Sequence, residues 1–245
     1  MFTRSRRRDE PSGPYWRQRG WQLSAGFVAV VFVLGGTIAL TAGEDRAREP
    51  APGGPLSGRA AGGDSRPQGC RTDDGDDAVP TTAPRGVEWR TIGVVRVPVS
   101  PAAGPTRTDG GMRWCFAHTP VGAVLAAHVI PSQLSEPGWR EVLDQQVVAG
   151  PGRDRFEFQR GLVRDSSARR SDGSVATYTG FSVASYEGSD ATVDLLMRTG
   201  SGYATTSIDL RWSGGDWKIR PSDGGDLHTP VSVVQNPRGY VLWGR

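Results

Sequence analysis

The longest apolar stretch of the chain lies near its N-terminus. Residues 20–43 contain no charged side chain, and their central part, Phe27–Leu40, is rich in Val, Phe and Leu. A helix rises about 1.5 Å per residue, so this stretch is long enough to cross a hydrocarbon layer of about 30 Å. The pattern predicts a transmembrane helix over residues 21–43.

The charges on the two sides of this stretch are unequal. Residues 1–20 hold six arginines and two acids, whereas Glu44 and Asp45 follow the apolar stretch. Because cytoplasmic flanks carry the excess of Lys and Arg, we expect a cytoplasmic tail over residues 1–20 and an extracytoplasmic C-terminal domain. A cleaved signal peptide is the alternative, but its apolar region is usually roughly 7–15 residues long and ends in an A-x-A site. We therefore predict an uncleaved, single-pass anchor in the cell membrane that contacts the bilayer through residues 21–43.

The next part of the chain, residues 44–85, has the composition of a linker. Residues 44–69 are rich in Gly and Pro and contain one large apolar side chain, Leu56, while residues 70–85 are acidic and then rich in Pro and Thr. Such segments bury too little apolar surface to offset the entropy lost on ordering. We predict a disordered stalk over residues 44–85 and a folded domain over residues 86–245.

The start of that domain mixes strand and helix signals. Val87–Pro98 combines alternation with a short Val run and predicts one or two strands. Thr119 followed by Pro120 predicts a helix start, because Thr can cap and Pro at the first helical position loses no hydrogen bond. Pro131 is expected to end or kink this helix. Its predicted inner face consists of Val121, Val124, Leu125 and His128.

Two further helical patterns follow. Ser135 is a second cap residue, and an apolar stripe predicts a helix over residues 136–148. A third helix is predicted over residues 153–163, with Phe156 and Leu162 pointing inward. The stripe of the second helix consists of Trp139, Val142, Leu143 and Val147.

The apolar period then changes from that of helices to two. Alternating residues predict four strands, and glycines lie between them at the expected turns. One face of these strands is apolar and the other largely polar, which is typical of an antiparallel sheet with one buried face. Helices followed by consecutive hairpins predict the α+β class rather than α/β. The predicted strands are residues 175–186, 191–198, 207–212 and 216–220.

Two motifs carry a resemblance to a known family. They are the helix start Thr-Pro-x-Gly-Ala-x-Leu-Ala-Ala at Thr119–Ala127 and the closing hairpin Leu-Arg-Trp-Ser-Gly-Gly-Asp-Trp-Lys-Ile at Leu210–Ile219. Over roughly residues 115–221 the chain resembles the nuclear transport factor 2-like superfamily, which implies helices packed into a strongly curved, cone-like sheet. The anchored architecture resembles extracytoplasmic domains of conjugation and type IV secretion components of Gram-positive bacteria. With 28 arginines and one lysine, the composition also resembles a GC-rich actinobacterial chain.

The net charge has a different meaning once it is divided by position. The whole chain carries 29 Lys+Arg and 26 Asp+Glu, but residues 44–245 carry 23 bases and 24 acids. Binding to nucleic acid requires a local surplus of cations, and the predicted exported part has none. We expect no nucleic-acid partner.

The two cysteines, Cys70 and Cys115, are candidates for a disulfide. Both follow the predicted anchor and would therefore lie in an oxidising compartment. A bond between them would connect the segment before the first strand to the start of the first helix. Two unrelated thiols are the alternative.

Known catalytic and metal-binding motifs are missing from the sequence. It contains no G-x-S-x-G, no P-loop and no H-E-x-x-H, and its three histidines are scattered. We expect no catalytic residue, no cofactor and no metal. The candidate pocket-lining residues, for which core packing is the alternative, are His128, Trp139, Trp212 and Trp217.

Together these patterns predict a membrane protein with a non-enzymatic extracytoplasmic interaction domain. Its expected partners are other envelope proteins, in a structural role within a conjugation or type IV secretion complex. The alternative is a domain that binds a small ligand or an envelope glycan inside its cone. The oligomeric state is left open.

Overall fold

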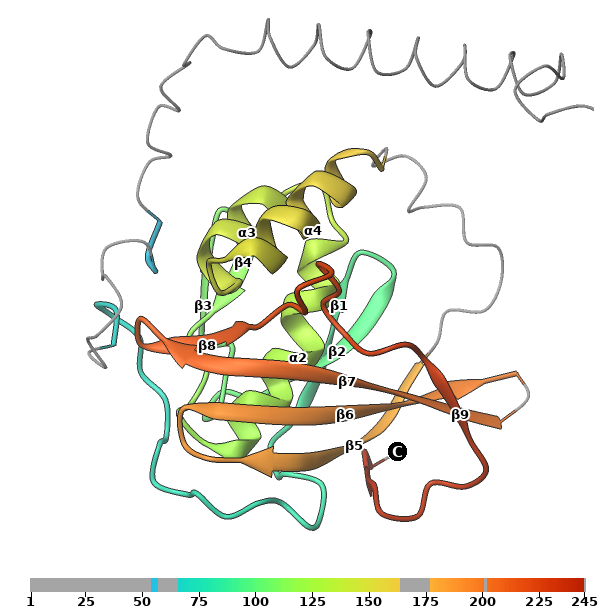
Figure 1. Ribbon diagram of the computed structural model, residues 1–245. Helices are drawn as coiled ribbons and strands as arrows, with labels where there is room; N and C mark the ends of the chain where they lie inside the picture. The colour runs from blue at the N-terminus through green and yellow to red at the C-terminus, as the bar shows by residue number, and fades with distance from the viewer. Residues whose placement is uncertain (1–53, 57–65, 164–176, 201, 245) are drawn as a thin grey trace, which may run out of the picture. The chain divides into compact units, whose positions relative to one another are not determined.

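The structure, a computed structural model, describes residues 54–56, 66–163, 177–200 and 202–244 (Figure 1). The tail predicted over residues 1–20 and the transmembrane helix predicted over residues 21–43 lie outside these ranges. Within the described part, no helix is both long and apolar enough to cross a membrane. Helices and mostly antiparallel strands make up this part, which confirms the α+β class.

Six strands form an antiparallel sheet in which β5, β6 and β7 are the long central strands. Val193 and Leu195 of β6 and Ile208 and Leu210 of β7 are buried, whereas the intervening Asp209 is exposed. Because side chains alternate across a strand, the sheet has one apolar face, as predicted. The strands are β5 (Thr177–Tyr186), β6 (Asp190–Thr199), β7 (Gly202–Ser213), β8 (Asp216–Ile219), β9 (Ser232–Val234) and β10 (Val241–Leu242).

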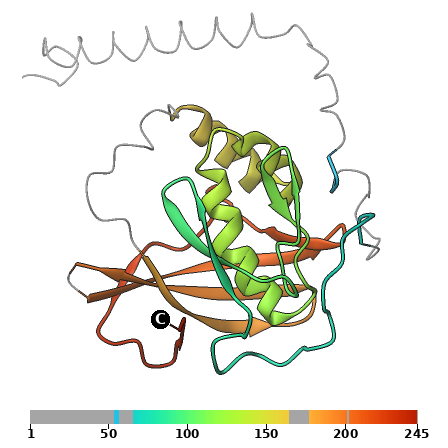
Figure 2. The same cartoon turned by 180° about the vertical axis from the view of Figure 1, so that it is seen from behind.

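Helix α2 (Pro120–Leu134) packs on the apolar face of this sheet (Figures 1 and 2). Its first turn forms as predicted, because the Thr119 hydroxyl accepts a hydrogen bond from the N–H of Gly122 (3.1 Å). The helix does not end at Pro131, which was one of the two outcomes expected there. It continues for another three residues, and the hydroxyl of Ser135 donates to the Pro131 carbonyl (3.2 Å).

The predicted inner face of α2 is too narrow, because the helix is buried on almost all sides. Only Val121 and Pro131 among its residues are partly exposed. Two hairpins cover the side of α2 that faces away from the sheet (Figure 2). A helix enclosed in this way needs apolar residues all round, so its sequence shows little periodicity. The hairpin strands are β1 (Glu88–Ile92), β2 (Val95–Val99), β3 (Arg107–Asp109) and β4 (Met112–Trp114).

Helices α3 (Trp139–Gln146) and α4 (Pro151–Gly161) form a second helical layer beside α2. The N–H of Ser135 bonds to the Ser132 carbonyl, so Ser135 ends α2 and does not cap α3, contrary to the prediction. Leu162 was expected to point inward but is 72 % exposed, because it follows the last turn of α4.

Part of the predicted linker belongs to the folded domain. Leu56 is buried, and its N–H donates to the Gln145 side-chain oxygen (2.7 Å). Residues 66–85, which we call the strap, run along the outside of the domain (Figure 1), and the Asp73 N–H donates to the Ala102 carbonyl (2.9 Å). The boundary expected at residue 86 therefore lies inside the folded unit. Composition could not show this, because backbone hydrogen bonds and one disulfide attach the strap where apolar side chains are few.

Candidate functional site

An apolar cavity of about 470 Å³ lies between the C-terminal half of α2, helix α4 and the sheet. The helices contribute one wall and the central strands contribute the other, while the segment after β8 closes one side. Its volume falls within the roughly 300–1,000 Å³ of small-molecule sites. The apolar lining includes Pro131, Leu134, Phe156, Leu195, Met197 and Ile208.

Polar groups interrupt this apolar wall, and two of them are charged: Arg160, whose guanidinium lies on the Trp139 ring, and Asp226, which accepts from the Ser222 hydroxyl (3.1 Å). The Tyr178 hydroxyl forms a hydrogen bond with the side chain of Ser132, whose own hydroxyl donates to the His128 carbonyl (2.8 Å). Burial raises the pKa of Tyr178 above its usual value, so this hydroxyl is neutral at physiological pH. At the opposite wall the Thr206 hydroxyl donates to the Thr229 carbonyl. The arrangement suits a largely apolar molecule that carries one or two neutral hydrogen-bonding groups.

His128 lies one layer behind the cavity wall. Its ring contacts Tyr178 (4.7 Å between centroids) and Trp243 (5.5 Å), and its Nδ1 lies 2.8 Å from the Val124 carbonyl oxygen. Since the carbonyl accepts, Nδ1 carries the proton. Burial lowers the pKa of His128 to about 4, so the imidazole is neutral in the folded protein.

Replacing His128 by Leu is expected to remove a loss of stability at acid pH. The folded-state pKa of about 4 lies below the usual 6.5, so the unfolded chain binds an additional proton between these values. The wild type therefore loses on the order of 3 kcal/mol from this group as pH falls from 7 to 4, and His128→Leu does not. Urea unfolding of the full-length protein at several pH values measures the difference between the two. A difference that stays constant from pH 7 to pH 4 would contradict this assignment.

The expectation that His128, Trp139, Trp212 and Trp217 line a pocket is not met at this cavity. Trp139 is buried behind Phe156 (6.4 Å between centroids), with the guanidinium of Arg160 on its ring. Trp212 and Trp217 contact each other (5.5 Å) and lie around His118, away from the cavity.

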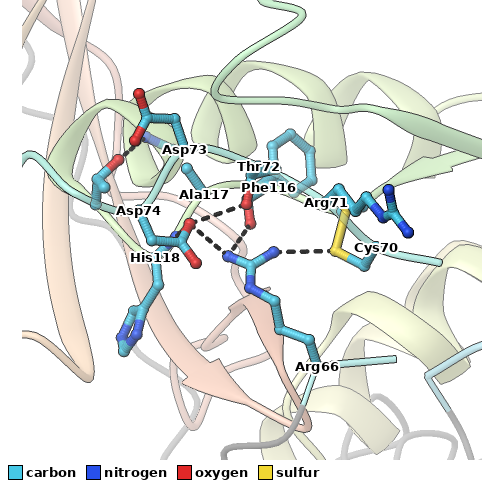
Figure 3. A network of polar contacts seen from close by, with 12 residues as sticks. Arg66, Cys70, Arg71, Thr72, Asp73, Asp74, Phe116, Ala117 and His118 are labelled. Atoms are coloured by element: carbon cyan, nitrogen blue, oxygen red, sulfur yellow. Dashed lines mark hydrogen bonds and ion pairs between the residues drawn. A yellow bond between two sulfur atoms is a disulfide. The ribbon is translucent and has the colours of Figure 1, made fainter. Parts of the chain in front are cut away.

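A second site joins the strap to the start of α2. Cys70 and Cys115 form a disulfide across 45 residues. The Arg66 guanidinium donates to Cys70 Sγ (3.0 Å), to the Phe116 carbonyl (3.1 Å) and to Asp74 Oδ1 (2.7 Å), as Figure 3 shows. Asp74 Oδ1 also accepts from the His118 N–H (3.0 Å). These contacts attach the strap firmly to the loop before α2.

Asp216, which the sequence did not mark as a site residue, binds the backbone of that loop from the interior of the domain. Its fully buried carboxylate accepts from the N–H groups of Cys115 (2.7 Å), Phe116 (2.9 Å) and Trp217 (3.0 Å). Burial raises the pKa of Asp216 to about 6, although these N–H groups and Arg66 act in the opposite direction. The available signal was an acid directly after the Gly-Gly turn of the β7–β8 hairpin, followed by an apolar strand.

The carboxylate stabilises an unusual backbone conformation. Cys115 has a φ of 74°, the only positive φ of a non-glycine among the described residues. Such a conformation persists only when its surroundings hold it. Here the disulfide and the two N–H groups bound to Asp216 hold it, so the site is a structural clasp for the strap.

The fold and the two sites define an α+β domain with a disulfide-bonded strap and an apolar cavity. Residues 50–242 match the model of the family described as "Domain of unknown function (DUF8175)", and the chain belongs to that family. The match includes the strap, in agreement with a folded unit that starts before residue 86. Comparisons with curated proteins and with solved structures gave no match.

Proposed function

We propose that this chain is a single-pass membrane protein whose extracytoplasmic domain binds a small, largely apolar ligand. The uncharged stretch over residues 21–43 and the arginines before it support the anchor and its orientation. The domain is non-enzymatic in this proposal. The disulfide is in keeping with an oxidising location.

The apolar cavity carries the proposal. The sequence alone favours envelope proteins as partners, with a small ligand as the alternative. The cavity favours the small ligand. Its neutral hydroxyls, Tyr178 and Ser132, orient a ligand without requiring it to be charged. Helices on one face of an antiparallel sheet, with a cavity between, also support the nuclear transport factor 2-like arrangement. The resemblance to conjugation components supports an envelope setting, in which the ligand is an envelope molecule.

A bulky side chain in the cavity should weaken ligand binding by about tenfold or more. Met197 lines the cavity from β6 and is only partly buried, so Met197→Trp reduces the free volume with little strain on the core. The probe is N-phenyl-1-naphthylamine, a neutral apolar dye, titrated into the full-length protein in detergent. Partition into the detergent is the same for every variant, and the saturable part of the fluorescence reports the cavity.

We expect saturable binding by the wild type and by the matched control Met197→Leu, which nearly preserves the volume. Met197→Trp should weaken it by about tenfold or more, which corresponds to about 1.4 kcal/mol. Thermal unfolding of the three proteins verifies that they are folded. Equal saturable binding by Met197→Trp, or no saturable binding by the wild type, would refute the proposal.

A further inference from the structure

A second cleft, of about 620 Å³, lies at one end of the sheet. It shares only Tyr178 with the lining of the apolar cavity. The cleft is formed by four parts of the chain: the β1–β2 hairpin, the start of β5, the adjoining ends of β6 and β7, and the C-terminal segment. Figure 1 shows the C-terminal segment returning beside β5, where β10 pairs with that strand. Its lining includes Trp89, Arg96, Arg198, Tyr203 and Trp243.

Aromatic rings and guanidinium groups are paired in this cleft. The guanidinium of Arg96 lies 5.8 Å from the Trp89 ring centroid, and that of Arg198 lies 5.4 Å from the Tyr203 ring centroid. Trp89 in turn packs edge-to-face on Trp243 (5.9 Å). A guanidinium on an aromatic ring is held in place and keeps its N–H edge for other partners.

The charge of the cleft is positive. Its described lining contains two arginines and no Asp or Glu. Neither Arg96 nor Arg198 forms an ion pair within the described part of the chain, and the nearby Glu88 is bonded to Arg90 (2.6 Å). Arginine binds carboxylate and phosphate groups in a two-pronged geometry, so the cleft is suited to an anion.

We propose that this cleft binds an acidic saccharide, meaning a sugar unit that carries a carboxylate or a phosphate. The C–H face of a sugar ring is apolar and packs on aromatic rings, and Trp89, Tyr203 and Trp243 are the aromatic rings that line the cleft. Arg96 and Arg198 bind its acidic group. This site is independent of the apolar ligand proposed above: Met197 lines only the cavity and Arg198 only the cleft, while Tyr178 borders both.

The test is a calorimetric titration of the full-length protein in detergent with water-soluble probes. Trigalacturonic acid supplies carboxylates, glucose 1,6-bisphosphate supplies phosphates, and maltotriose is the neutral control. Glycerophosphoglycerol represents the headgroup of an anionic lipid. We expect at least one acidic saccharide to bind at least tenfold more tightly than maltotriose and than glycerophosphoglycerol. Whichever of trigalacturonic acid and glucose 1,6-bisphosphate binds more tightly shows whether the cleft prefers a carboxylate or a phosphate.

Variants locate the binding. Arg198→Gln and Arg96→Gln should each weaken binding of the acidic saccharide by about tenfold or more, since hydrogen bonds to charged groups are strong. Arg198→Lys keeps the charge but not the planar group, and it should give an intermediate affinity. Arg211→Gln is the matched control, because Arg211 is exposed on β7 outside the cleft.

Three results would overturn the proposal. The first is no binding of either acidic saccharide, and the second is an equal loss in Arg211→Gln, which would mean non-specific attraction. The third is glycerophosphoglycerol as the tighter ligand, which would assign the cleft to lipid headgroups. Because Met197→Trp leaves the cleft arginines in place, failure of the cavity proposal and failure of this one are distinguishable.

Discussion

Asp216→Ala is expected to destabilise the protein by about 3–5 kcal/mol at pH 5, because it leaves buried N–H groups without an acceptor. Three backbone N–H groups, of Cys115, Phe116 and Trp217, share this carboxylate. Each buried donor left without a partner costs about 1–3 kcal/mol. Loss of the carboxylate also removes two of the contacts that hold Cys115 at positive φ. Urea unfolding of the full-length protein measures the effect.

Asp216→Asn separates the charge of this group from its shape. The amide oxygen can still accept, but the amide nitrogen faces a backbone donor. We therefore expect Asp216→Asn to be less stable than the wild type and more stable than Asp216→Ala. The pKa of about 6 lies above the usual 3.8, so the folded protein binds an additional proton between these values. Stability from this group is therefore present at low pH and declines, by on the order of 3 kcal/mol, as pH rises from about 4 to above 6.

The deficit of Asp216→Asn relative to the wild type should consequently shrink as pH rises through this window. A deficit that grows with pH would show that the carboxylate is stabilised in its charged form, contrary to the burial argument. His128 acts over nearly the same window with the opposite sign. The two effects largely cancel in the wild type, so the single variants reveal what the wild-type pH profile does not.

Removal of the disulfide should cost about 4 kcal/mol. The bond between Cys70 and Cys115 closes a loop across 45 residues, and the chain-entropy relation gives about this value for such a loop. The double variant Cys70→Ala/Cys115→Ala, or reduction of the wild type, should lower the urea midpoint accordingly. Release of the strap should also speed trypsin cleavage after Arg71 and Arg85, which are already exposed, because the backbone around them is no longer held in place.

The double variant is the control for the reducing agent, because reduction should not affect it further. A loss below about 1 kcal/mol, with unchanged trypsin cleavage in the strap, would show that the Arg66 and Asp74 contacts hold the strap without the covalent bond. Release of the strap is not expected to abolish binding of the apolar ligand in the cavity, since the strap contributes no residue to the cavity lining.

Short-range features of the fold were predictable from the sequence. The Thr119–Pro120 cap begins α2 where the residues indicated, and alternation in β6 and β7 gave the correct buried face. The Gly214–Gly215 turn joins β7 to β8 with two glycines at positive φ, as two-residue hairpins require. These features depend on neighbouring residues, so the local pattern is sufficient to determine them.

The short strands and the sites were not predictable in this way. β3, β9 and β10 have two or three residues each, too few to show a period, and each forms because a distant or adjacent strand pairs with it. Leu56 appears in a linker by composition, yet Gln145, 89 residues away, fixes its backbone. The apolar cavity and the arginine cleft are bounded by segments far apart in the chain.

The sequence by itself therefore determined the α+β class and the order of the principal helices and strands, while the membrane topology of the N-terminal segment stays a prediction. Only the tertiary structure decided which apolar side chains fill the core and which line a cavity, and that Asp216 is buried beneath Cys115. The physical reason is that helix caps, turns and alternation are properties of a few consecutive residues. Burial, cavities and shifted pKa values arise from side chains that only folding brings together.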